Sequence, residues 1–261
     1  MRLSVVIPSY KDPYLQKTID SLLDNSELGD QLEIIPVLDG YWQEIKHDPR
    51  VRVVHIGKNG GMRRSINAGV KVAKGEFIMR LDEHCMFGKG YDKIMTDSCQ
   101  PNWIMTAVRY FLDPVKWEVM DLPPVICEKL VIQGGKKFSG QRWPSRDEEF
   151  KNEPLIESMA MQGSMWITPR KWFNEVIVEL ETEGYGPAYQ DSHEAIFKTW
   201  QAGGKFMVNT NTWFAHKHRT FTRTHQEGTK QNPWIREQSW AHGLKVWRDY
   251  YEKEIKPKWG I

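Results

Sequence analysis

The sequence predicts an α/β protein built on a mostly parallel central sheet, with helices on both faces. Two features predict this class: continuous apolar strands, and amphipathic helices that separate them along the chain. The chain has 261 residues, of which 40% are hydrophobic, so it can bury the core of one substantial domain.

The first ninety residues contain the clearest alternation. Short apolar runs indicate strands, and longer stretches with apolar residues on one helical face indicate helices. The strands are predicted at 3–8, 32–38, 51–56 and 76–81, and the helices at 12–25 and 61–73. Because ligands bind at the carboxyl ends of parallel strands, the residues directly after these strands are candidate site residues.

The pattern is looser in the middle of the chain. The polar stretch 134–154 indicates a loop or hairpin excursion, which we expect to face a substrate. Two glycines end the predicted helix at 190–204, and Pro169 is compatible with the first turn of the helix before it. The predicted elements are strands at 103–111, 124–132 and 158–168, a helix from near Pro169, a helix at 190–204, and strands at 205–209 and 212–219.

The C-terminal segment 221–261 has two parts. The polar, irregular stretch from Thr220 to Asn232 is expected to order over a bound ligand as a lid. Residues 233–255 have amphipathic helical spacing. The tryptophans of this helix are expected near one face, in the core: Trp234, Trp240 and Trp247.

No internal repeat or flexible linker divides the chain. We therefore expect one compact domain with two lobes, a nucleotide-binding half at 1–98 and an acceptor half at 99–220. The C-terminal segment 221–261 is expected to pack on the same domain.

Composition indicates a cytoplasmic location. No apolar run approaches the roughly 18 residues of a membrane span, and the N-terminus lacks the features of a signal peptide. The three cysteines, Cys85, Cys99 and Cys127, are an odd number without metal-ligand spacing, so we expect reduced thiols and no disulfide.

Positive charge is concentrated near the C-terminus. The net charge is only +2, but residues 213–261 carry ten Lys and Arg against five Asp and Glu, with five Trp among them. Two interpretations stay open: a solvated basic face over packed aromatic residues, or a surface that attracts the phosphates of a nucleotide or polynucleotide.

Polar residues follow three of the predicted strands: Pro8-Ser9-Tyr10, Asp39-Gly40 and Asp82-Glu83-His84. In a parallel sheet these residues should meet in one crevice. The third group is the most informative, because buried carboxylates are costly to desolvate unless positive charge lies among them. A divalent metal meets that requirement.

Residues 58–91 resemble the donor-binding half of family 2 glycosyltransferases of GT-A fold. That family has an N-x-G-x(5)-N-x-G helix followed by a "GE(Y/F)I" strand and an aspartate-rich D-x-D motif. Here the matching positions are Asn59, Gly61, Asn67, Gly69, Gly75 and Glu76. The tripeptide is D-x-H, and "LDEHC" followed by Gly90-Tyr91 is similar to polypeptide N-acetylgalactosaminyltransferases.

The resemblance continues in order to about residue 220. Gly163-Ser164 takes the place of a glycine pair that lines the donor sugar, and "FAHKHR" resembles a later histidine-x-x-arginine, which places His216 and Arg219. One motif departs: tryptophan-glycine-glycine-glutamate has become Ala188-Tyr189-Gln190-Asp191. That change leaves the acceptor open.

The resemblance implies a metal-dependent site. Asp82, His84 and His216 are expected to bind a divalent metal, with Mn²⁺ favoured over Mg²⁺ by mixed carboxylate and imidazole ligands. Glu83 is expected to point away or to orient a neighbour. His84 also has the alternative of being a buried histidine with protein partners only.

The resemblance also places the nucleotide sugar. Pro8, Ser9, Tyr10 and Asp39 are expected at the base and ribose, although Asp39 could instead be a turn aspartate. Arg64 could reach phosphate, with Arg63 as solvated surface. Arg219 could pair with diphosphate oxygens or form a structural ion pair.

Asp191 is the expected acceptor-side carboxylate. Its functional interpretation is that it takes the proton of the attacking hydroxyl. Its structural interpretation is that of an aspartate stabilising the first turn of a helix.

The predicted function is transfer of a sugar from a nucleoside-diphosphate sugar, with uridine diphosphate favoured, to a hydroxyl acceptor. A nucleotidyltransferase would need a more basic loop after the first strand than Lys11 provides. Two alternatives are kept: a DNA-modifying transferase acting on a hydroxymethylated base, and a nucleic-acid-binding protein with an inactive transferase core. The acceptor, the sugar, the stereochemical outcome and the oligomeric state stay open.

Overall fold

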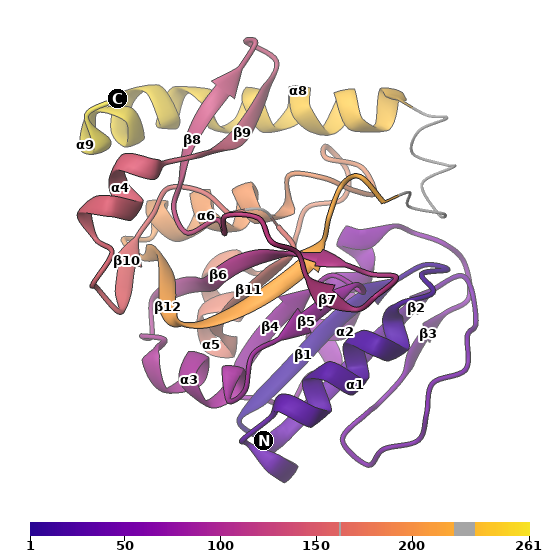
Figure 1. Ribbon diagram of the computed structural model, residues 1–261. Helices are drawn as coiled ribbons and strands as arrows, with labels where there is room; N and C mark the ends of the chain where they lie inside the picture. Colours follow the sequence, from indigo (N-terminus) through magenta and orange to yellow (C-terminus); the bar gives the residue numbers. More distant parts are fainter. Residues whose placement is uncertain (162, 222–232) are drawn as a thin grey trace.

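A computed structural model describes residues 1–161, 163–221 and 233–261. It has a central sheet with helices packed against both faces (Figure 1). The strands are β1 (Leu3–Ser9), β2 (Leu32–Asp39), β3 (Val54–Ile56), β4 (Phe77–Leu81), β5 (Cys85–Phe87), β6 (Trp103–Asp113), β7 (Glu118–Val119), β8 (Glu128–Gln133), β9 (Lys137–Arg142), β10 (Leu155–Glu157), β11 (Met165–Pro169) and β12 (Lys205–Lys217). The helices are α1 (Leu15–Asn25), η1 (Gly29–Gln31), α2 (Met62–Val72), α3 (Tyr91–Ser98), α4 (Pro144–Glu149), α5 (Arg170–Trp172), η2 (Phe173–Ile177), α6 (Asp191–Gln201), α8 (Pro233–Tyr250), η3 (Tyr251–Ile255) and α9 (Lys256–Trp259).

The main sheet has the order β10-β12-β6-β11-β4-β1-β2-β3. The pairs β1–β2, β1–β4, β2–β3 and β6–β12 are parallel, whereas β11 runs antiparallel to its neighbours β4 and β6. The α/β class predicted from the sequence is therefore confirmed, and the parallel strands of the N-terminal half end at one edge.

Strand β1 is buried on both faces, which explains its continuous apolar sequence. Val6 packs on one face with Ile66 of α2, while Val5 packs on the other with Ile19 of α1. Alternate side chains of a strand point to opposite faces, so each face needs its own helix. Gly69 lets α2 approach closely, because a Cβ at this position would lie 2.3 Å from Val6 Cγ1.

Strand β12 joins the C-terminal half to the candidate metal motif. The predicted strands at 205–209 and 212–219 form this single strand, with a register shift between Asn209 and Trp213 where it pairs with β6. Its final residues pair antiparallel with β5, and His216 lies opposite Cys85. A residue far along the chain is thereby placed beside the loop after β4.

The polar stretch 134–154 forms the second strand of a hairpin, β8–β9, followed by α4. The hairpin lies beside α8, which crosses the top of the molecule in Figure 1. Phe138 of the hairpin contacts the ring of Tyr251, with 5.3 Å between ring centroids, and Trp247 stacks on Phe197 of α6. These contacts attach the C-terminal helix to the acceptor half.

The prediction for the tryptophans of α8 was only partly right. Trp247 is buried, but Trp240 lines a cavity and Trp234 is 58% exposed. At 3.6 residues per turn, the six-residue step from Trp234 to Trp240 rotates the side chain by roughly 120°, whereas seven residues return it to within roughly 20°. Trp234 therefore cannot share the face of the other two.

Two further sequence predictions need comment. The predicted strand 158–168 is a strand only from Met165. Residues Ser158–Met161 form a buried loop instead, in which the Ala160 N–H donates a 3.0 Å hydrogen bond to the Glu128 carbonyl.

The expected lid falls largely on residues 222–232, outside the described part of the chain. Among the described helices, none has the length and apolar character needed to cross a bilayer.

We predict that Gly69→Ala destabilises the protein by about 1–3 kcal/mol, because the added methyl group meets Val6 in a packed core. This loss outweighs the roughly 1 kcal/mol that alanine gains over glycine in a helix. Urea unfolding measures the change. Gly243→Ala in α8 is the matched control, since its Cβ would meet no atom closer than 3.4 Å, and it should be neutral or stabilising. Equal effects would contradict the close-approach role of Gly69.

Candidate active site

A cavity of about 1370 Å³ opens where the parallel strands end. One wall comes from the N-terminal half, and the other from the β8–β9 hairpin, the start of α6 and the start of α8. Pockets for single small molecules usually measure roughly 300–1,000 Å³, so this one has room for a donor and part of an acceptor. The sequence-predicted residues that line it are Pro8, Ser9, Tyr10, Asp39, Asp82, His84, Gly163, Ser164, Asp191, His216 and Arg219.

Asp82, His84 and His216 form a compact group of potential metal ligands. One ligand atom from each lies within 4.8 Å of the others, and Asp82 Oδ2 is 3.1 Å from His216 Nε2. The Nε2 atom of His84 is buried and has no hydrogen-bond partner in the described part of the chain. A buried polar atom without a partner is costly unless a ligand completes it, so these three residues fit a divalent metal.

Asp12 orients His84. Its Oδ2 lies 3.0 Å from His84 Nδ1, and its Oδ1 accepts a 2.8 Å hydrogen bond from the Tyr14 N–H. Metal-binding histidines commonly donate their second ring N–H to a carboxylate, which fixes the tautomer. Asp12 thus directs His84 Nε2 toward Asp82 and His216. The sequence analysis placed Asp12 only at a helix start and missed this role.

Glu83 holds the loop after β1. Its carboxylate accepts a 3.0 Å hydrogen bond from the Tyr10 N–H, and its carbonyl accepts one of 3.0 Å from the Thr18 hydroxyl. Burial, followed by the nearby Asp12 carboxylate, raises the pKa of Glu83 well above its usual value. Glu83 therefore orients a neighbouring segment, one of the two roles expected for it.

Arg80 connects the metal motif to the acceptor side. It is only 2% exposed, and its guanidinium lies 2.7 Å from Asp82 Oδ1 and 3.4 Å from Asp191 Oδ2. It also donates to the Gly163 carbonyl. Burial lowers the pKa of Arg80, but the Asp82 and Asp191 carboxylates outweigh it, so the net shift is upward. Burial likewise raises the pKa of Asp82, but the charge of Arg80 and the hydrogen bond with His216 bring it below its usual value. Asp82 is therefore ionised at neutral pH.

Asp39 fixes the turn that precedes α2. Its two oxygens accept hydrogen bonds of 2.8 Å and 2.7 Å from the Gly60 and Gly61 N–H groups. Asn59 donates to the Asp39 carbonyl at 3.1 Å. These bonds hold a segment distant in the chain, which differs from the alternative considered for Asp39, a turn aspartate directly before Gly40. A carboxylate has about four lone-pair sites, so the same group can still accept from a nucleotide base.

The structure places the two adjacent arginines differently from what was expected. Arg63 was expected to be solvated, but it is fully buried, forms an ion pair with Glu194 and donates to the Tyr189 carbonyl at 2.8 Å and 3.0 Å. Arg64, expected to reach phosphate, is exposed, lies over Gly60 and does not line the cavity. Helical neighbours point about 100° apart, so only one of the two could face inward.

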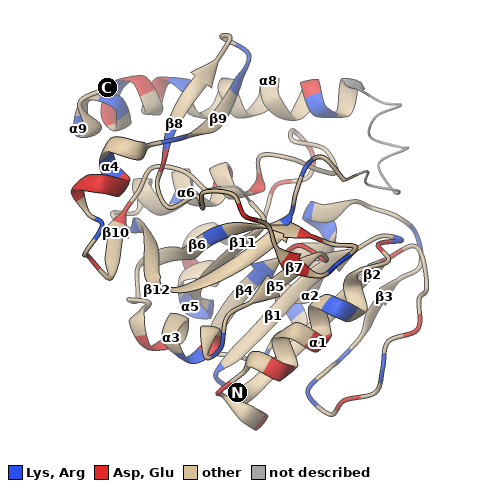
Figure 2. Cartoon of the chain, viewed as in Figure 1, with Lys and Arg blue, Asp and Glu red and all other residues tan. Residues whose placement is uncertain are grey.

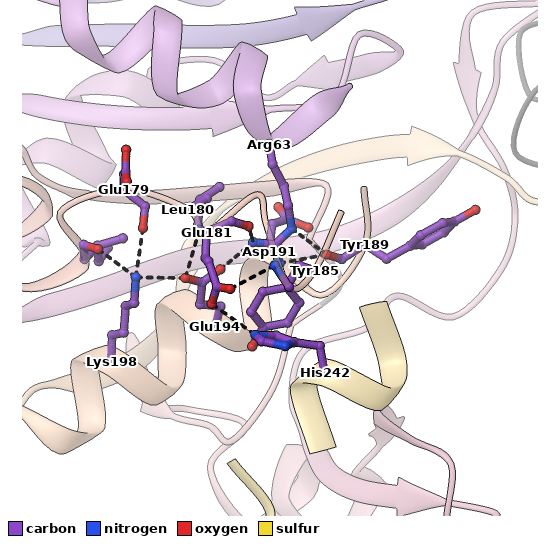
Figure 3. A network of polar contacts seen from close by, with 12 residues as sticks. Arg63, Glu179, Leu180, Glu181, Tyr185, Tyr189, Asp191, Glu194, Lys198 and His242 are labelled. Carbon is purple, nitrogen blue, oxygen red and sulfur yellow. Dashed lines mark hydrogen bonds and ion pairs between the residues drawn. The ribbon is translucent and has the colours of Figure 1, made fainter. Parts of the chain in front are cut away.

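The buried Arg63 is the centre of a polar network shown in Figure 3. Glu194 also pairs with Lys198 at 2.8 Å, and Glu181 lies 3.1 Å from His242 Nε2 of α8. The Arg63 guanidinium stacks over the ring of Tyr185 at 4.0 Å. The network thereby joins α2, α6 and α8 around the loop that leads to Asp191.

That loop has an unusual backbone. Tyr189 and Gln190 have φ values of 67° and 55°, in the left-handed region that side-chain-bearing residues rarely adopt. Such conformations cost roughly 1–3 kcal/mol each and persist where surrounding contacts enforce them. Here Arg63 supplies the enforcing contacts at the Tyr189 carbonyl. The result is that Asp191, the first residue of α6, is held in the cavity wall.

The donor-side backbone is placed by similar contacts. The Asp82 N–H donates to the Ser164 carbonyl at 2.8 Å, and the buried Ser164 hydroxyl has no partner among the described residues. Arg219 is exposed and follows β12 at the cavity rim. Ser164 and Arg219 therefore both line the cavity, as the sequence-based site requires.

Besides Asp12, sequence reasoning missed three residues of the cavity wall. Arg80 could have been noticed as a charged residue inside an otherwise apolar strand, because buried arginine is rare without a partner. Lys137 and Trp240 line the cavity from the hairpin and α8, but their spacing in the sequence carries no signal.

Comparison with known proteins defines the class. The chain matches the family model described as "Glycosyl transferase family 2" over residues 4–177, more than half of its length, and it belongs to that family. The resemblance found in the sequence is therefore confirmed. The chain is 23% identical over 97% of its length to mouse polypeptide N-acetylgalactosaminyltransferase 4, and 26% identical over 77% of its length to human polypeptide N-acetylgalactosaminyltransferase 10.

Solved structures agree on the fold. GalNAc-T7 with UDP, GalNAc and Mn²⁺ superposes with a TM-score of 0.70 at 18% identity, covering 84% of this chain and 44% of that one. Staphylococcus aureus TarS 1-349 superposes with a TM-score of 0.55 at 13% identity, covering 83% of this chain and 60% of that one. The fold is thus of GT-A type. The chain spans 44% and 35% of the mouse and human relatives.

We predict that Arg63→Met destabilises the protein by about 3 kcal/mol or more, because it removes one of the two cations of the buried Glu194 carboxylate and the donor to two carbonyls. Arg64→Met removes the same charge from the exposed neighbour and should stay within about 0.5 kcal/mol. Chemical denaturation of both variants measures the difference. Similar stabilities would show that the network around Arg63 contributes little.

Proposed function

We propose that this protein transfers a sugar from a uridine diphosphate sugar to a hydroxyl acceptor with the help of Mn²⁺. One observation carries the proposal: Asp82, His84 and His216 converge on a cavity at the strand ends, and the buried Nε2 of His84 has no partner among the described residues. The mixed oxygen and nitrogen donors support Mn²⁺ over calcium or a structural zinc site. The UDP and Mn²⁺ named for the GalNAc-T7 structure support the same donor class.

Metal chemistry explains the need for these ligands. A divalent cation bound there would act as a Lewis acid and neutralise the charge that develops on the leaving diphosphate. Asp82, His84 and His216 would hold it, and Asp12 would keep His84 in the correct tautomer.

The N-terminal wall would hold the nucleotide. Pro8, Ser9 and Tyr10 form a loop fixed by Glu83, and Asp39 lies at the neighbouring strand end. We propose that this wall binds base and ribose. Arg219 at the rim would approach the diphosphate, since a guanidinium binds phosphate oxygens in pairs.

Asp191 would act on the acceptor side. Its carboxylate lines the cavity, and Arg80 keeps it in place across from the metal group. In a single displacement that inverts the anomeric carbon, Asp191 would take the proton of the attacking hydroxyl. In a retaining reaction it would orient acceptor or donor hydroxyls.

The two alternative functions are separated by different observations. The complete ligand group and the room in the cavity favour an active transferase over an inactive core. The cations of the hairpin and α8 favour an anionic acceptor, which keeps a DNA-modifying activity as the second candidate.

We predict that UDP and Mn²⁺ bind cooperatively, because diphosphate oxygens complete a coordination shell that has few protein ligands. Calorimetry should show each ligand strengthening the binding of the other by the same factor, as linkage requires. His84→Ala and His216→Ala should abolish this coupling while each variant keeps its cooperative thermal transition. Independent binding of UDP and Mn²⁺ to the wild type would contradict the proposed site, and unfolding of either variant would indicate a purely structural histidine.

We predict that Asp191→Asn lowers turnover by about 100-fold or more, since general-base contributions are commonly 10² to 10⁴. Binding of UDP with Mn²⁺ should stay unchanged, because Asp191 lies outside the ligand group. Steady-state kinetics and product stereochemistry are measured together. Turnover within a few fold of wild type would leave Asp191 with its helix-end role alone, and a retained anomeric configuration would exclude the single-displacement role.

A further inference from the structure

We propose that the wall formed by the β8–β9 hairpin and the start of α8 binds a single-stranded nucleic acid as the acceptor. The inference rests on the proposed transferase function and names its acceptor class. It comes from cations, aromatic rings and one buried histidine that the donor site does not use.

Two cations converge on one indole in this wall. Lys137 Nζ lies 4.5 Å from the centroid of the Trp240 ring, and the Arg236 guanidinium lies 4.8 Å from it. All three residues line the cavity. Figure 2 shows blue segments on β9 and near the N-terminal end of α8. The indole holds two positive charges close together, which favours an anion between them.

A second pair of cations lines the same cavity. The guanidiniums of Arg109 and Arg142 lie 5.4 Å and 5.7 Å from the centroid of the Phe111 ring. One carboxylate, Glu128, lies 3.9 Å from Arg109. Burial lowers the pKa of Arg109. The Glu128 carboxylate raises it, and the positive charge of Arg142 lowers it, so the net shift is downward. A bound anion would relieve this repulsion.

The cations form a track rather than one point. Phe111 is the register partner of His216 in the β6–β12 pair, so its two arginines begin beside a proposed metal ligand. Arg142 and Lys137 lie at opposite ends of β9, roughly 16 Å apart at about 3.3 Å per residue. A track of this length fits a chain of several phosphates leading away from the reaction centre.

His193 indicates that the ligand also has neutral polar groups. Both of its ring nitrogens are buried without a partner in the described part of the chain, and the residue lines the cavity. Burial, followed by Lys137 and Arg63, lowers the pKa of His193 to about 4, so the ring is neutral at pH 7. A neutral imidazole offers one donor and one acceptor, which suits the edge of a base.

These features together favour a nucleic acid over an acidic peptide. A nucleic-acid strand presents regularly spaced phosphates to arginine and lysine, and neutral base edges to His193. The indole of Trp240, which lines the cavity beside both cations, supplies an aromatic ring for base stacking. An acidic peptide would supply the charges but no aromatic base to stack.

The test measures binding of a single-stranded DNA of about 12 nucleotides, within the usual site size for such proteins, at several salt concentrations. UDP and Mn²⁺ are present at saturation so that the donor site is filled. The double variant Lys137→Ala/Arg236→Ala should weaken binding about tenfold or more. Each lost phosphate contact should reduce the slope of log affinity against log salt by about 0.7, so the two together should reduce it by about 1.4.

The matched control is Lys136→Ala/Lys245→Ala. It removes the same charge from exposed positions on the same hairpin and helix, outside the cavity. It should bind within about twofold of wild type, with melting temperatures showing that both double variants are folded. His193→Phe should weaken binding without changing the salt slope, because the lost group is neutral.

Several results would overturn the inference. Equal losses in the two double variants would show that only net charge attracts the DNA. Equally tight binding of a poly-glutamate peptide would indicate an acidic polypeptide acceptor. If UDP binds with Mn²⁺ but the wild type does not bind DNA, the inference fails and the proposed function stands. If UDP and Mn²⁺ do not bind, the proposed function itself fails.

Discussion

The buried guanidinium of Arg80 is the interaction on which the site depends. It lies between two carboxylates, the half-buried Asp82 and the buried Asp191, and it also donates to the carbonyl of Gly163. Without this cation Asp82 would lose the charge that holds its pKa down, and it would tend to take up a proton. A protonated Asp82 would be a poor metal ligand. Arg80 therefore determines both the shape and the charge of the cavity.

A second buried arginine sets the position of the acceptor side. Arg63 connects α2 to the loop before α6 through the Tyr189 carbonyl and Glu194, and Asn67 of the same helix exchanges hydrogen bonds of 2.8 Å and 2.9 Å with the backbone of Leu180. Both side chains come from the helix that carries the family's asparagine motif. That helix covers the sheet, contributes Met62 and Ser65 to the cavity lining, and fixes the loop before α6.

The sequence was most informative where burial imposes a pattern. Continuous apolar strands and amphipathic helices predicted the α/β class, and the polar residues after the strands predicted the cavity wall. It was least informative where a role depends on contacts distant in the chain. Nothing near Asp12 indicates that it meets His84, and the choice between Arg63 and Arg64 depends on which side of α2 faces Glu194. Lys137 reaches Trp240 only because the hairpin lies beside α8.

The pairing of β12 with β5 has a consequence for how the protein becomes active during synthesis. His216 is separated by 134 positions from Asp82, the carboxylate it contacts, and it reaches that carboxylate only as part of the antiparallel ladder opposite Cys85. Residues 1–98 can emerge from the ribosome and build their parallel strands while the third metal ligand has not yet been translated. Since closing so long a loop is entropically costly, it belongs to a late step of folding. The growing chain therefore cannot bring Asp82, His84 and His216 together until strand β12 has been made.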